Sequence, residues 1–129
     1  MLAPGLHTLD ANIYVHVMDA ARPGPTAIIQ AGIHGDEIAG VHALEELLEA
    51  RLAPTHGRLI VIPVMNPPAY RNRTRAAPGG LDLNRCFPGD PNGEQRETRL
   101  ADAFMQMIRG ESPDLLVTLH ESNKRYDPE

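Results

Sequence analysis

Two short and almost wholly apolar runs place the strongest constraint on the fold of this 129-residue chain. They are Thr26–Ala31 (TAIIQA) and Leu59–Met65 (LIVIPVM). Runs of this length without polar alternation are typical of strands that are buried on both faces of a parallel sheet. Between them, from Asp36 to about Leu52, apolar residues recur at helical spacing. The chain therefore predicts a strand–helix–strand crossover in which helices cover the sheet.

The other segments extend this alternation. Ala11–Met18 mixes β-branched and aromatic residues and predicts an edge or hairpin strand. Glu94–Arg109 has a second helical pattern, and Asp114–His120 reads as a final strand. Asn66–Gly93 is predicted to be a polar loop that is too long for a mere connector. The expected fold class is α/β, a three-layer doubly wound mixed sheet forming a single domain over 1–129.

Composition and charge exclude several classes of function. The net charge of −5 at pH 7 gives no general attraction to nucleic acid or to anionic membranes. The single cysteine, Cys86, cannot form an internal disulfide, which favours a reducing compartment. Met1–Thr8 lacks the pattern of a secretory signal, and the apolar runs are too short to span a bilayer. We expect a cytoplasmic protein with neither nucleic-acid nor membrane partners.

Polar residues with metal-binding side chains follow the predicted strands. His34 and Asn66 come after the two apolar runs, and His120 closes the last strand. In doubly wound sheets, ligands bind beyond the carboxyl ends of the strands. These side chains are therefore expected to converge at one edge of the sheet.

His34 and Glu37 are three residues apart at a strand-to-helix junction, where both side chains can share one metal. Asp36 and Glu37 are expected in the first helical turn, where the helix dipole favours anionic side chains. His120 would complete a His₂Glu set, which leaves a fourth position for water as in catalytic zinc sites. Two alternatives stay open: Asp36 as the ligand in place of Glu37, and His120 as a hydrogen-bonded core residue.

The long loop combines basic residues with an amide. An arginine fork donates two parallel hydrogen bonds to a carboxylate, and Asn84 beside Arg85 adds a neutral donor and acceptor. Arg71 and Arg73 are interpreted as solvated, and the loop has no aromatic platform for nucleic acid. The four arginines of the loop are Arg71, Arg73, Arg75 and Arg85. The apolar neighbours expected to anchor Asn84 and Arg85 are Leu81, Leu83 and Phe87.

Three ordered motifs carry a family resemblance: HGDE at His34–Glu37, DLNRCFPG at Asp82–Gly89 and LH at Leu119–His120. Together they resemble the zinc carboxypeptidase clan, and within it the succinylglutamate desuccinylase/aspartoacylase family. The resemblance runs in order from about Ala27 to His120. It implies a carboxypeptidase-like fold and the hydrolysis of an amide bond, either in an N-acyl amino acid or at the C-terminus of a peptide.

The resemblance also implies roles for particular residues. One Zn²⁺ per chain would be held by His34, Glu37 and His120. The carboxylate of a small-molecule substrate would be held by Asn84 and Arg85, with Arg75 as an upstream arginine.

The family pattern continues past the third ligand with a glutamate that acts as general base and acid. The chain ends at Glu129, so this general base is expected to be absent from it. Glu121 would point to the opposite face of a strand from His120. We expect either a fragment of a longer enzyme or a metal-binding domain without turnover. A sheet truncated after the third ligand would leave an unpaired edge, which favours homo-oligomers.

Overall fold

The computed structural model describes residues 1–122, so Glu129 lies outside the described residues. Five strands form one mixed sheet in the order β1-β2-β4-β3-β5. β3 runs parallel to β4 and β5, whereas β2 is antiparallel to β1 and β4. The elements are β1 (Gly5–Asp10), β2 (Ile13–Asp19), β3 (Thr26–Gln30), α1 (Ile38–Glu49), β4 (Arg58–Ile62), α2 (Pro67–Asn72), the 3₁₀ turn η1 (Leu83–Arg85), α3 (Arg96–Glu111) and β5 (Leu115–Thr118).

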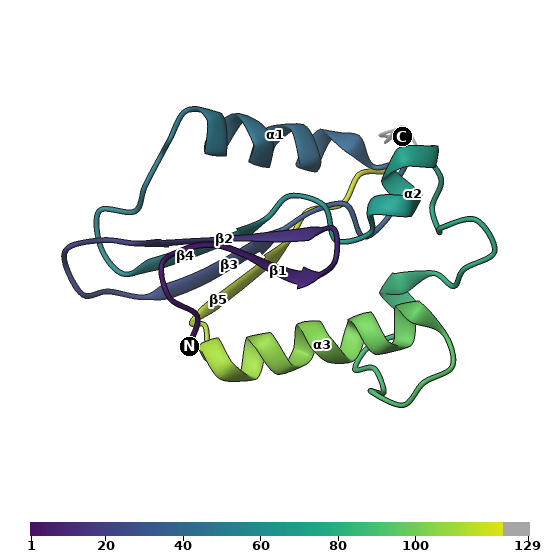
Figure 1. Cartoon of the computed structure of the whole chain (residues 1–129). Helices are drawn as coiled ribbons and strands as arrows, with labels where there is room; N and C mark the ends of the chain where they lie inside the picture. The colour runs from purple at the N-terminus through teal and green to yellow at the C-terminus, as the bar shows by residue number, and fades with distance from the viewer. Residues whose placement is uncertain (123–129) are drawn as a thin grey trace, which may run out of the picture.

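Helices cover both faces of this sheet, with α1 on one side and α3 on the other (Figure 1). Adjacent residues of β3 point to opposite sides, so Ile28 belongs to the apolar cluster that contains Phe104 of α3, while Ile29 packs against the cluster that contains Val41 of α1. Because both faces of β3 and β4 are covered, these strands need apolar residues without alternation, as their sequences show. The predicted three-layer α/β fold is confirmed.

Several predicted boundaries were wrong in informative ways. α1 begins at Ile38, so Asp36 and Glu37 precede the helix and do not lie in its first turn. Glu37 has φ −98° and ψ 77°, outside the helical region. The long polar segment contains α2, whose Pro67 occupies a first-turn position that lacks an intrahelical hydrogen-bond acceptor. β1 was missed because, as an exposed edge strand, it carries little apolar alternation.

Within the described residues, β5 pairs with β3 alone and leaves its outer edge without a neighbouring strand. Leu115 and Leu116 on this strand are exposed. Unpaired, apolar edges favour association with another strand. Self-association of the chain stays a prediction.

Candidate metal centre

The three predicted ligands come together at one edge of the sheet. His34 and Glu37 lie in the turn after β3, and His120 follows the end of β5. β3 and β5 are parallel neighbours, so their carboxyl ends meet at the same edge. One ligand atom from each of the three residues lies within 4.8 Å of the others. The predicted convergence is therefore present, and it includes the predicted Glu37 and not the alternative Asp36.

A close contact with α2 holds the His34–Glu37 turn in place. The backbone N–H of Gly35 donates to the carbonyl oxygen of Thr74 at 2.9 Å. A Cβ atom at Gly35 would lie 2.0 Å from the backbone carbonyl of Ala69, so only glycine allows this approach. The glycine of the HGDE motif thus lets the turn pack against α2 and point His34 along the edge of the sheet.

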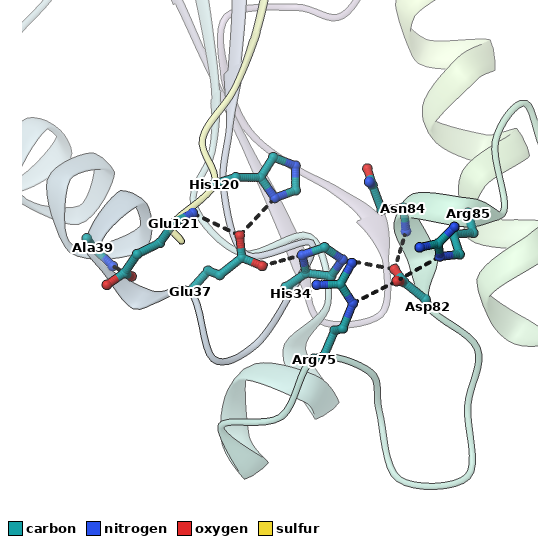
Figure 2. Close-up of polar contacts among 9 residues, drawn as sticks. All are labelled: His34, Glu37, Ala39, Arg75, Asp82, Asn84, Arg85, His120 and Glu121. Atoms are coloured by element: carbon teal, nitrogen blue, oxygen red, sulfur yellow. Dashed lines mark hydrogen bonds and ion pairs between the residues drawn. The ribbon is translucent and has the colours of Figure 1, made fainter. Parts of the chain in front are cut away.

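The Glu37 carboxylate lies between the two imidazoles (Figure 2). Its Oε2 contacts His34 Nδ1, and its Oε1 lies 3.0 Å from His120 Nδ1. The backbone N–H of Glu121 also donates to Oε1, at 2.8 Å. Burial raises the pKa of Glu37, but the Glu121 N–H, the His120 hydrogen bond and the neighbouring His34 together hold it below its ordinary value. The carboxylate is therefore kept ionised, as a metal ligand must be.

Asp82 is a residue of the site whose role was missed from the sequence. Its Oδ1 lies 2.9 Å from His34 Nε2 and accepts a hydrogen bond from the backbone N–H of Asn84 at 3.0 Å. Burial raises the pKa of Asp82, but the hydrogen bonds with His34, Arg75 and the Asn84 N–H lower it by more. The pKa of Asp82 is therefore below its ordinary value. A carboxylate on the far nitrogen of a ligand histidine fixes the ring and its tautomer.

This donor set fits zinc. Two imidazole nitrogens and one carboxylate oxygen are typical zinc ligands, and two ligands of one ion at about 2 Å are separated by roughly 4 Å or less. The three ligand atoms lie within 4.8 Å of one another, which is near that separation. With His34 Nδ1 toward Glu37, its Nε2 is left to Asp82, which is the arrangement that a metal-binding histidine needs.

A family model for the succinylglutamate desuccinylase/aspartoacylase catalytic domain matches residues 23–127. The chain belongs to this family. It is 41% identical to an N-alpha-acetyl-L-2,4-diaminobutyric acid deacetylase of Halomonas elongata, over 81% of this chain and 30% of that protein. It is 30% identical to murein peptide amidase A of Escherichia coli, over 77% of this chain and 52% of the amidase.

The fold of this succinylglutamate desuccinylase/aspartoacylase domain also matches a solved structure of the family. A succinylglutamate desuccinylase/aspartoacylase from Rhodobacter sphaeroides superposes with a TM-score of 0.75 at 39% identity. The match covers 84% of this chain and 33% of the other. The chain thus spans about a third to a half of the length of these relatives.

The structure places the predicted substrate residues of this family member around Asp82. Arg75 Nε donates to Asp82 Oδ2 at 2.9 Å, and Arg85 Nε lies 3.6 Å from the same oxygen. Arg85 is 80% exposed, so its guanidinium remains open to a ligand. Asn84 is also exposed, and its backbone is fixed by Asp82. Their predicted role in holding a substrate carboxylate stays a prediction.

The anchors of this loop are only partly those expected. Leu83 is fully buried, and Phe87 packs edge-on against Phe104 of α3 at 6.0 Å between ring centroids. Leu81 was expected to anchor the loop as well, but it is 43% exposed because the chain before η1 runs over the surface. Arg71 and Arg73 are exposed, as predicted.

A hollow of about 300 Å³ opens beside the candidate ligands, between α3 and the end of β5. Its polar lining includes Asn84, Thr118 and His120, and its apolar lining includes Phe104 and Leu116. This volume lies at the small end of ligand pockets. Across the described residues, no helix combines the length and apolar character needed to cross a membrane.

Proposed function

We propose that this chain carries the zinc-binding part of a hydrolase that cleaves the amide bond of N-acyl amino acids. The observation that carries the proposal is the convergence of His34, Glu37 and His120 from two parallel strands. Zinc held by such a set supplies a Lewis acid and activates a water molecule. The names of the deacetylase relative and of the matched family support an acyl amino acid as the substrate.

The chain's own residues would bind and orient the substrate. Arg85 and Arg75 would donate hydrogen bonds to its carboxylate, because each has guanidinium N–H groups beyond the one that faces Asp82. Asn84 reaches the hollow beside His120 and would hold the same carboxylate. A hollow of about 300 Å³ favours a small acyl amino acid over a long peptide.

Glu121, the carboxylate next to His120, is not placed as a general base. Its carboxylate accepts a hydrogen bond from the backbone of Ala39, so it faces α1 and not the hollow. Zinc binding by these 129 residues would therefore not by itself mean that they catalyse hydrolysis, and the two need separate tests. A metal-binding domain without turnover remains the rival to the enzyme.

A peptide substrate is the second candidate, and the 30% identity to a murein peptide amidase favours it. Hydrolysis assays with N-acetyl and N-succinyl amino acids against small peptides, each followed by amine release, would decide between them. Faster release from acyl amino acids supports the first proposal, and faster release from peptides supports the second. No release from either, in a protein that binds zinc, supports the non-catalytic rival.

The zinc site itself is tested by metal content. The purified chain is expected to bind one zinc ion, and His34→Ala and His120→Ala are each expected to lose most of it. His42→Ala is a matched control, because His42 is an exposed histidine of α1 that belongs to no metal-binding group among the described residues. Wild-type protein without zinc, or ligand variants that keep it, would contradict the proposal.

A further inference from the structure

The segment that follows β5 is seated on the first turn of α1. The backbone N–H of Leu119 donates to the carbonyl oxygen of Gln30 at 2.9 Å, and its side chain packs in the cluster beneath α1. Gly40 makes room for it, since a Cβ there would lie 2.7 Å from the Leu119 Cβ. The end of β5 is thus packed against the start of α1 at the point where the metal ligands meet.

Glu121 joins these two elements through both its side chain and its backbone (Figure 2). Its Oε2 accepts a hydrogen bond from the backbone N–H of Ala39 in the first turn of α1, at 3.1 Å. Its own backbone N–H donates to Glu37 Oε1 at 2.8 Å. One residue therefore binds the helix with its carboxylate and the candidate metal ligand with its amide.

α1 requires an acceptor from elsewhere in the chain. The first N–H groups of a helix have no intrahelical partner, and a carboxylate near them is favourable. The N-cap residue, Glu37, makes no side-chain capping hydrogen bond because its carboxylate faces the two histidines, and the first turn contains no acidic residue. Glu121 supplies the missing acceptor from 82 residues further along the chain.

We propose that Glu121 is a positioning residue for the metal ligand Glu37. Its carboxylate fixes the segment after β5 on α1, and this places its amide so that the N–H holds Glu37 Oε1. The orientation of the Glu37 carboxylate toward the histidines then depends on a side chain that does not touch the metal. This inference rests on the proposed zinc site, and residues that orient metal ligands typically contribute about 10- to 100-fold in affinity.

Two substitutions separate positioning from charge. Glu121→Ala removes the acceptor for Ala39, whereas Glu121→Gln removes the charge but keeps an oxygen that can accept the same hydrogen bond. We expect Glu121→Ala to weaken zinc binding about tenfold. Glu121→Gln should stay within about threefold of wild type. Glu46→Ala, which removes an exposed carboxylate from α1 away from the site, is the matched control and should leave the affinity unchanged.

The measurement is the zinc dissociation constant by competition with a chromogenic chelator, with the apo Tm of each variant from circular dichroism. A role in helix capping alone would lower the apo Tm of Glu121→Ala without changing its zinc affinity, and that result would overturn the inference. Equal weakening by Ala and Gln would also overturn it, because these variants share only the loss of charge. If Glu121→Ala does not fold, Glu121→Gln and Glu121→Asp are compared instead. The inference is supported if Gln keeps a near wild-type zinc affinity while Asp, with its shorter side chain, binds zinc more weakly. Equal zinc affinities of these two variants would overturn it. Wild-type protein that fails to bind zinc refutes the proposed site itself, which distinguishes the two failures.

Discussion

Two charged clusters lie at opposite ends of the same parallel strands, and they are built on different principles. At the amino end of β4, Arg58 pairs with Asp19 and Glu111. At the carboxyl ends of β3 and β5, Glu37 is surrounded by His34 and His120. Each cluster contains a buried carboxylate beside nitrogen-bearing side chains, Glu111 in the first and Glu37 in the second. Only in the first does that carboxylate face a permanent cation.

The Arg58 cluster is complete in itself. The guanidinium donates to Asp19 at 2.7 Å, to Glu111 at 2.8 Å and to the carbonyl oxygen of Leu2 at 2.9 Å. The Glu111 side chain is only 2% exposed. Hydrogen bonds to Asp19 and then to Glu111 raise the pKa of Arg58 above its ordinary value. Such a cluster joins β2, β4 and α3, and four of the five N–H groups of Arg58 donate to acceptors among the described residues.

The cluster at the other end has a different balance. Among the described residues, the ion pairs of Glu37 are with the two histidines, and neither Lys nor Arg pairs with it. Imidazoles and a carboxylate that share one point form a donor set for a cation. The comparison teaches that a buried charge does not by itself mark a functional site in this molecule. The distinguishing feature is whether imidazoles or a guanidinium face the buried carboxylate.

The largest expected effect is at the metal end. Zinc at about 1,000 times its dissociation constant should raise the free energy of unfolding of the wild type by about 4 kcal/mol. Glu37→Gln should abolish this increase, because the amide lacks the charge that completes the donor set. Chemical denaturation with and without zinc measures it. An undiminished zinc effect in Glu37→Gln would show that the carboxylate is not a ligand.

The next largest effect is expected at the Arg58 cluster, where a substitution should lower stability and leave zinc affinity unchanged. Arg58→Met leaves the Glu111 carboxylate buried without its cation, which should lower the free energy of unfolding by about 3 kcal/mol. The zinc dissociation constant should stay within twofold of wild type in the folded protein. The double variant Arg58→Met/Glu111→Leu is the control and should recover part of the stability, since it removes the unpaired charge. A change in zinc affinity would contradict the separation of the two clusters.

The sequence anticipated the parts of the site that depend on strand ends. The apolar runs at Thr26–Ala31 and Leu59–Met65 predict buried parallel strands, and the ends of such strands converge whatever the loops do. His34 and His120 were predicted on that ground. Asp82 was not, because its contact with His34 spans 48 residues and depends on the conformation of the intervening loop. Loop conformation has no periodic signal in sequence.

Glu121 shows a second kind of limit. Its side chain was correctly predicted to lie opposite that of His120, since it meets Ala39 of α1 whereas His120 lines the hollow beside α3. Strand alternation, however, does not reveal that this carboxylate accepts a hydrogen bond from a helix 82 residues earlier in the chain. Likewise, Asp36 and Glu37 carry the acidic signature of a first helical turn, but α1 begins one residue later because Glu37 turns toward the histidines.

A smaller effect should follow from the residue behind His34. Asp82→Asn keeps the shape of the side chain but weakens its hold on the imidazole and on Arg75. We expect zinc affinity to fall about tenfold, or 1.4 kcal/mol. Chelator competition measures it, and Asp90→Asn, which alters a carboxylate of a nearby turn, is the control. Unchanged affinity in Asp82→Asn would mean that His34 is oriented by its own turn alone.

The smallest effect concerns pH and the Arg58 cluster. The hydrogen bond from Arg58 lowers the pKa of Asp19, with burial opposing in part and the charge of Arg58 adding to the shift. Because folding favours the ionised form, this contribution is complete above the ordinary aspartate pKa of about 3.9 and is lost as the pH falls through the lower folded pKa. The Tm difference between wild type and Asp19→Asn should therefore hold at neutral pH and shrink as the pH falls below about 4. In the Arg58→Met background the same substitution should show little pH dependence, since the group that lowers the pKa is gone. If the Tm difference between wild type and Asp19→Asn does not change with pH, the charge of Asp19 does not contribute to its interaction with Arg58. The contrast between the two clusters would then rest on Glu111 alone.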